Sequence, residues 1–117
     1  MTNLYEQATA RPEGFRDVQP AVAERALDGV RIIDVREPHE YIGELGHVAG
    51  AQLVPLGTLP QQLQGWNKDE TYLMVCKSGG RSGQAAAFLA KQGFQRVMNL
   101  AGGMLAWNAL SLPVERG

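Results

Sequence analysis

Two short apolar runs, at residues 30–35 and 71–76, dominate the hydrophobic pattern of this chain. Both are rich in β-branched or large apolar side chains, and neither alternates strictly with polar residues. Such runs are typical of strands that are buried on both faces of a parallel sheet. Shorter runs bounded by turn-forming residues predict three further strands, at residues 15–18, 52–54 and 96–99.

Between these five runs lie segments with helical character, at residues 20–27, 37–42, 56–63, 82–92 and 104–109. The clearest is 82–92, which contains strong helix formers, has Lys91 near its end and is followed by the stop signal Gly93. Because short strands alternate with helices, the pattern predicts an α/β fold. We expect a central five-stranded, mostly parallel sheet with helices on both faces.

The length of 117 residues suits one domain and is too short for two independent cores. Residues 1–14 carry no clear strand signal and end in the turn-forming sequence RPEG at 11–14. We therefore expect an N-terminal arm or a loose first helix over residues 1–14, followed by a single domain over residues 15–117.

Charge and composition argue against several classes of partner. The 11 basic and 12 acidic side chains give a formal net charge of -1, so no overall field attracts the protein to a nucleic acid. No apolar run approaches the roughly 18 residues that span a bilayer, and the N-terminus lacks the features of a signal peptide, so we expect a cytoplasmic protein. With one cysteine and two histidines, His39 and His47, we expect no metal site.

The single cysteine, Cys76, stands at the carboxyl end of the second apolar run and is followed by the sequence KSGGRSG at 77–83. A lone cysteine is most often a small apolar residue of the core. At the end of a parallel strand, however, it lies where open α/β sheets bind their ligands. Gly79 and Gly80 can turn successive N–H groups inward, and the helix predicted to begin near Ser82 adds the positive end of its dipole.

This environment favours the thiolate form of Cys76. Inward-facing N–H groups, a helix dipole and the nearby cations Lys77 and Arg81 all stabilise negative charge on the sulfur and lower the pKa of the thiol. We therefore predict that Cys76 is a nucleophile rather than a core residue.

Residues 76–82 (CKSGGRS) resemble the active-site loop of the rhodanese, or thiosulfate sulfurtransferase, family. Three further segments resemble other signatures of the same family: residues 32–41 (IIDVREPHEY), 46–51 (GHVAGA) and 99–107 (NLAGGMLAW). These segments occur in the family's order, so the resemblance runs from about residue 16 to 114 and is to a single-domain rhodanese. One departure is Ala49, where the family usually has a proline that stiffens the turn.

The resemblance implies a sulfurtransferase that needs no cofactor. Cys76 would take sulfur from thiosulfate or another sulfane donor, hold it as a persulfide, and pass it to a thiol, cyanide or a protein of a sulfur relay. The backbone amides of the loop would stabilise the persulfide anion, and the Lys77 and Arg81 cations would attract an anionic donor. The residues expected to bind substrate are Lys77, Ser78, Gly79, Gly80, Arg81 and Ser82.

Asp34 and Arg36 are expected to support the site rather than to react. Asp34 ends the first apolar run, and its carboxylate should order neighbouring loops through hydrogen bonds or through an ion pair that includes Arg36 and Glu44. The hydroxyl of Ser82 either donates to the loop or caps the helix, and we expect the cap because Ser82 stands at the predicted start of that helix.

Two alternatives to a sulfurtransferase stay open. A rhodanese-like cysteine phosphatase or arsenate reductase also has a strand-end cysteine and a loop that ends in arginine. In the loops of those enzymes, five residues separate the cysteine from the arginine, whereas four residues separate Cys76 from Arg81. The shorter loop argues against binding an oxyanion of phosphate size. The other alternative is a sulfur-carrier module that a partner protein loads, which uses the same Cys76 persulfide.

Overall fold

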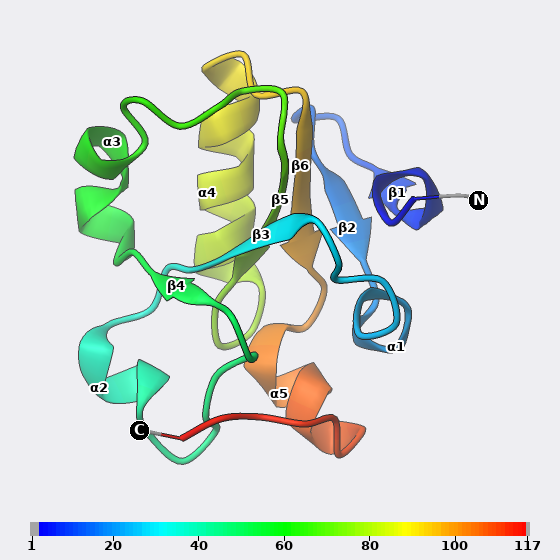
Figure 1. The fold of residues 1–117 in the computed structure, drawn as a ribbon, viewed down its shortest axis with the longest axis vertical. Coiled ribbons are helices and arrows are strands. Elements are labelled where there is room, and N and C mark those ends of the chain that lie inside the picture. Colours follow the sequence, from blue (N-terminus) through cyan, green and yellow to red (C-terminus); the bar gives the residue numbers. More distant parts are fainter. Residues whose placement is uncertain (1–2, 117) are drawn as a thin grey trace.

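The computed structural model describes residues 3–116, and in these residues six strands form one sheet (Figure 1). The strands are β1 (Thr9–Ala10), β2 (Arg16–Val18), β3 (Val30–Asp34), β4 (Gln52–Leu53), β5 (Thr71–Val75) and β6 (Arg96–Leu100). Their order across the sheet is β1-β2-β6-β5-β3-β4, with β1 and β2 antiparallel and every other neighbouring pair parallel. The five strands predicted from the hydrophobic pattern are confirmed.

Helices cover both faces of this sheet, as the alternating pattern predicted. They are α1 (Pro20–Ala23), α2 (Pro38–Tyr41), α3 (Leu59–Gln62), α4 (Gly80–Lys91) and α5 (Gly103–Ala109), with 3-10 turns at Tyr5–Gln7 and Leu56–Thr58. Side chains of α3 and α4 pack on one face of the sheet, and those of α1 and α5 pack on the other. Within the described residues, every helix is too short to cross a lipid bilayer.

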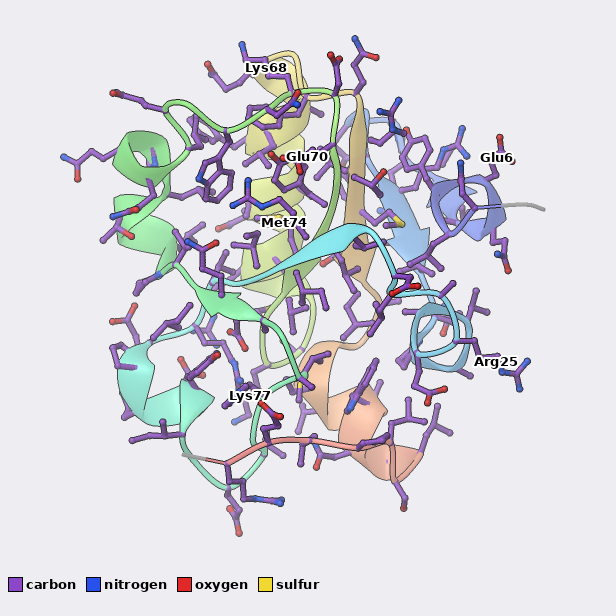
Figure 2. The ribbon with its side chains drawn as sticks, viewed as in Figure 1. Glu6, Arg25, Lys68, Glu70, Met74 and Lys77 are labelled. Atoms are coloured by element: carbon purple, nitrogen blue, oxygen red, sulfur yellow. The ribbon has the colours of Figure 1, made fainter. Side chains whose placement is uncertain are left out.

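Strand β5 shows how the alternation of side chains places the cysteine. Tyr72, Met74 and, just beyond the strand, Cys76 face α4, whereas Leu73 and Val75 face α5. All five side chains are almost fully buried. Because successive side chains of a strand point to opposite faces, Cys76 must lie under the start of α4. Figure 2 shows Met74 over the middle of the sheet, while Glu6, Arg25 and Lys68 project from the surface.

The N-terminal residues form more structure than the sequence predicted. Residues 5–7 make a 3-10 turn, and β1 adds a sixth strand to the sheet by pairing with β2. The ring of Tyr5 lies 4.1 Å beneath the guanidinium of Arg16, and Leu4 is 3% exposed against the core on the α5 side. The two residues of β1 are both exposed and too few to produce a readable hydrophobic pattern, which is why the sequence missed this strand.

A buried ion pair fastens the carboxyl end of β3. The Nη2 of Arg36 lies 2.7 Å from Oδ2 of Asp34, its Nε donates to Oδ1 at 2.9 Å, and both side chains are at most 1% exposed. The same Nη2 donates to the carbonyl of Gly46 at 2.8 Å, so the pair also holds the following loop. The expected pairing with Arg36 is present. Within residues 3–116 the Glu44 carboxylate forms no ion pair with Arg36, and the backbone carbonyl of Glu44 accepts a hydrogen bond from Arg116 at 2.9 Å.

We expect Asp34→Ala to lower the free energy of unfolding by about 3–5 kcal/mol, because it leaves the Arg36 guanidinium buried without an anion. Urea denaturation followed by circular dichroism measures this loss. The matched control is Asp28→Ala, at an exposed carboxylate, which should change the same quantity by at most about 0.5 kcal/mol. Equal effects of the two substitutions would contradict a supporting role for the buried pair.

Candidate active site

Cys76 follows the last residue of β5 and is 1% exposed. Its Sγ accepts a hydrogen bond from the backbone N–H of Gly79 at 3.1 Å and lies 3.2 Å from the hydroxyl of Ser82. Burial raises the pKa of the Cys76 thiol. Hydrogen bonds from the Ser82 hydroxyl and from the backbone N–H groups of Ser82, Gly79 and Ser78 outweigh burial, so the net pKa lies below the usual value. The loop is therefore built to hold a sulfur anion.

The turn from β5 into α4 brings these donors to the sulfur. Gly79 has a φ of +99°, a left-handed conformation that suits glycine, and α4 begins at the next residue, Gly80. The helix therefore starts two residues earlier than the sequence indicated. The prediction that Ser82 caps the helix is wrong, because Ser82 is the third residue of α4 and its hydroxyl faces the sulfur instead.

The backbone of α5 supports the loop from behind. The N–H groups of Met104 and Leu105 donate to the carbonyls of Cys76 and Lys77 at 2.9 and 3.0 Å. This contact requires Gly103, because a Cβ at that position would lie 2.4 Å from the carbonyl oxygen of Cys76 and 2.6 Å from that of Lys77. The close approach of α5 to the loop therefore depends on a residue without a side chain at position 103.

Arg81 does not face the sulfur as a free cation. Its Nη1 and Nη2 donate to Oε1 and Oε2 of Glu40 in α2, at 2.7 and 2.9 Å. Chiefly through this hydrogen-bonded pairing, Arg81 lowers the pKa of Glu40 from 4.5 to about 2. Lys77, in contrast, is exposed and forms no ion pair within residues 3–116. Of the two cations expected to attract an anionic donor, only Lys77 has a free charge.

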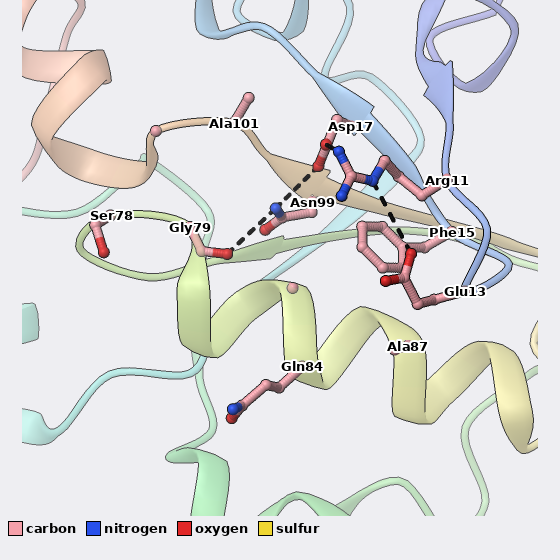
Figure 3. Close-up of a pocket in the computed structure, with 12 residues that line it drawn as sticks. Arg11, Glu13, Phe15, Asp17, Ser78, Gly79, Gln84, Ala87, Asn99 and Ala101 are labelled. Atoms are coloured by element: carbon pink, nitrogen blue, oxygen red, sulfur yellow. Dashed lines mark hydrogen bonds and ion pairs between the residues drawn. The ribbon is translucent and has the colours of Figure 1, made fainter.

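A second polar network reaches the loop from β6. Oδ1 of Asn99 lies 2.5 Å from the Ser82 hydroxyl, and Nδ2 of Asn99 donates to Asp17 at 3.0 Å and to the carbonyl of Gly79 at 3.3 Å. Asn99 is 6% exposed, whereas Asp17 is partly exposed and contacts Arg11 at 3.3 Å. Figure 3 shows Asn99 between Gly79 and Asp17.

A cavity of about 470 Å³ opens beside this network (Figure 3). Gly79 borders it from the loop, and Arg11, Glu13, Asp17 and Asn99 line the opposite side. The Arg11 cation forms ion pairs with Asp17 and with Glu13. The Oε1 atom of Glu13 lies 4.0 Å from the Nε atom of Arg11. The charged groups that line the cavity are therefore paired with one another.

Comparison with known proteins identifies the family. Residues 19–110 match the model of the Rhodanese-like domain. The chain belongs to the rhodanese-like family. A sulfurtransferase of Allochromatium vinosum is 37% identical over 87 residues, covering 74% of this chain and 79% of the relative. The thiosulfate sulfurtransferase GlpE of Stutzerimonas stutzeri is 32% identical over 94 residues, covering 80% and 84%.

A solved structure supports the same fold for this rhodanese-like domain. The rhodanese-related protein of Thermoplasma volcanium superposes with a TM-score of 0.77 and 27% identity, covering 85% of this chain and 96% of that one. The rhodanese-like α/β fold expected from the sequence is therefore confirmed, and the relatives include sulfurtransferases.

The sequence of this rhodanese-like domain did not mark three residues that the structure places at the site. Glu40 and Asn99 lie inside segments that resemble family signatures, so those signatures were the available signal. Nothing in the sequence pointed to Asp17, which reaches Asn99 across 82 positions of the chain. Their roles depend on contacts between separate strands and helices, which local patterns do not specify.

Gly103→Ala should lower the free energy of unfolding by about 2–4 kcal/mol, because the added Cβ meets two backbone carbonyls and the φ of +57° is strained for alanine. Thermal and urea unfolding measure the loss. The control is Gly57→Ala, where a Cβ would meet nothing within 4 Å. If both variants unfold alike, the close approach of α5 to the loop is not a constraint.

The Arg81 contact also predicts a pH dependence. A carboxylate whose pKa falls from 4.5 to about 2 on folding adds stability above pH 4.5, and this contribution disappears as the pH falls towards 2. The melting temperature of the wild type should therefore decline more steeply over this range than that of Glu40→Gln, which keeps a side chain able to cap α2. Glu24→Gln, at an exposed carboxylate, is the control and should follow the wild-type curve.

Proposed function

We propose that this rhodanese-like domain is a thiosulfate sulfurtransferase that carries sulfane sulfur on Cys76. The observation that supports this most is the buried sulfur at the start of α4, which receives hydrogen bonds from Gly79 and Ser82 at 3.1 and 3.2 Å. These hydrogen bonds favour the thiolate, which is the form of cysteine that attacks, and stabilise it as a leaving group.

In the first step, the Cys76 thiolate attacks the outer sulfur of thiosulfate or of a related persulfide. A bond forms between Sγ and the transferred sulfur, the sulfur–sulfur bond of the donor breaks, and its electron pair leaves with sulfite or with the donor thiolate. In the second step, a thiolate, cyanide or a protein acceptor attacks the outer sulfur of the Cys76 persulfide. The Sγ–S bond breaks and its electron pair returns to Cys76 as thiolate.

The chain's own groups have distinct parts in this reaction. The backbone N–H groups of Ser78, Gly79 and Ser82 stabilise the anionic sulfur, and the exposed Lys77 attracts the charged end of the donor. Asp34 and Arg36 hold the end of β3 beside the loop. No cofactor enters either step. A cytoplasmic location remains a prediction from the sequence.

The phosphatase alternative is disfavoured by Arg81. A cysteine phosphatase needs a loop arginine that faces the phosphoryl oxygens. Here both terminal nitrogens of Arg81 are bound to Glu40, and the loop between Cys76 and Arg81 has only four residues. A donor that transfers sulfur requires neither a phosphate cradle nor protonation of an oxygen leaving group.

The sulfur-carrier alternative has one observation in its favour. With Arg81 bound by Glu40 and Arg11 matched by Asp17, Lys77 is the only loop cation within residues 3–116 that is free to bind a dianion such as thiosulfate. A persulfide delivered by a partner protein would need less positive charge at the loop. Saturable turnover with thiosulfate and a thiol supports the enzyme, and loading by a protein persulfide alone supports the carrier.

Intact-protein mass spectrometry after incubation with thiosulfate tests the proposal. The wild type should gain the mass of one sulfur atom and lose it when a thiol is added. Cys76→Ser should gain no mass, because a serine hydroxyl is a much weaker nucleophile towards the outer sulfur of thiosulfate than a thiolate is. Arg25→Gln, at an exposed residue far from the loop in Figure 2, is the control and should be loaded like the wild type. A sulfur adduct on Cys76→Ser, or hydrolysis of an aryl phosphate without any adduct, would overturn the proposal.

A further inference from the structure

The hydroxyl of Ser82 has two acceptors within reach but only one proton to donate. It lies 3.2 Å from Sγ of Cys76 and 2.5 Å from Oδ1 of Asn99. Ser82 is 0% exposed, so water does not supply a third partner at the surface. The hydroxyl therefore cannot donate to the sulfur and to the amide oxygen at the same time.

Asn99 is held so that its oxygen, and not its nitrogen, faces Ser82. The Nδ2 group donates to Oδ1 of Asp17 and to the carbonyl of Gly79, and neither of these oxygens can donate in return (Figure 3). Turning the amide over would place its oxygen against both acceptors. Arg11 holds Asp17 in turn, so the orientation of Asn99 is set by a chain of contacts that reaches the protein surface.

The position of the Ser82 proton then depends on the state of the sulfur. When Cys76 is a thiol, its S–H donates to Ser82 and the hydroxyl donates to Asn99, so every polar group has a partner. When Cys76 is a thiolate, the negative sulfur is the stronger acceptor, so the Ser82 hydroxyl donates its hydrogen bond to Sγ. Oδ1 of Asn99 is then left without a donor. When the sulfur carries a second sulfur atom, Sγ is no longer an anion and the hydroxyl returns to Asn99.

We propose that Asn99 is a positioning residue that accepts the hydrogen bond of the Ser82 hydroxyl whenever Sγ of Cys76 carries no negative charge, and loses it to Sγ when the thiolate forms. Asn99 thereby opposes formation of the thiolate, whereas Ser82 favours it. Removing one of these side chains should shift the acid-base equilibrium of the thiol in the direction opposite to removing the other.

Ser82 and Asn99 act in the second step of sulfur transfer, an inference that rests on the proposed function. As an acceptor attacks the outer sulfur, negative charge develops on Sγ while the Sγ–S bond breaks. Rotation of the Ser82 hydroxyl from Asn99 to Sγ stabilises that charge as it appears. Ser82 is thus a catalytic residue that touches the leaving sulfur, and Asn99 acts through it.

The test is a titration of the Cys76 thiol, which is direct because the chain has a single cysteine. Thiolate absorbance in the ultraviolet against pH should show Ser82→Ala raising the Cys76 pKa by about one unit and Asn99→Leu lowering it by about half a unit. Leucine fills the space but accepts no hydrogen bond. The carbonyl of Gly79 still accepts the N–H of Gly83, and Asp17 still contacts Arg11.

The double variant separates positioning from a general effect on the loop. In the Ser82→Ala background, Asn99→Leu should leave the Cys76 pKa unchanged, because no hydroxyl remains to be positioned. The charged groups around the loop stay in place in all variants: Asp17, Asp34, Arg36, Glu40, Lys77 and Arg81. Asn108→Leu, which removes hydrogen bonds to the carbonyls of Leu45 and Met104, is the control and should not shift the pKa.

A measurement on the wild type covers the case in which Asn99→Leu fails to fold. The side-chain amide resonances of Asn99 in an NMR titration should move with the same midpoint as the Cys76 thiol, because Oδ1 loses its donor at that point. A pKa that rises in Asn99→Leu, a shift that persists in the double variant, or an Asn99 amide that does not respond would each overturn the inference. None of these readouts requires turnover, so they fail separately from sulfur loading.

Discussion

The hydrogen bonds that reach the buried sulfur of Cys76 are the interaction on which the rest of the site depends. A thiolate removed from water is strongly unfavourable unless donors replace the lost hydration. Gly79 and Ser82 supply these donors, Gly79 from the turn before α4 and Ser82 from the first turn of the helix. The parallel sheet serves this arrangement, because it ends β5 beneath the point where α4 begins, with the amino-terminal end of the helix dipole directed at the sulfur.

The charges around the loop are compensated mostly within the chain. Arg36 is bound to Asp34, Arg81 to Glu40 and Arg11 to Asp17, and each pair ties a different segment to its neighbours. Because these cations are paired, the loop is held in place and carries little uncompensated positive charge. Negative charge on the Cys76 sulfur is stabilised mainly by oriented dipoles, which act over short distances, while Lys77 is exposed and forms no ion pair within residues 3–116.

Much of the fold and the central residue of the site could be predicted from the pattern of residues. The apolar runs produced five parallel strands, and the position of Cys76 at a strand end marked the loop. The errors have local causes. Strand β1 is two exposed residues, and the start of α4 depends on the left-handed turn at Gly79, whose conformation glycine permits but does not require.

The sequence by itself determined the order of strands and helices, the cysteine at the end of β5 and the glycines that let the backbone turn around it, because these follow from periodicity and from the backbone preferences of single residues. Only the tertiary structure decided which partner each polar side chain has. Glu40 meets Arg81 across 41 positions, and Asp17 meets Asn99 across 82. Hydrogen bonds form within about 3 Å, a distance that is set by the packing of distant segments and that no local pattern contains.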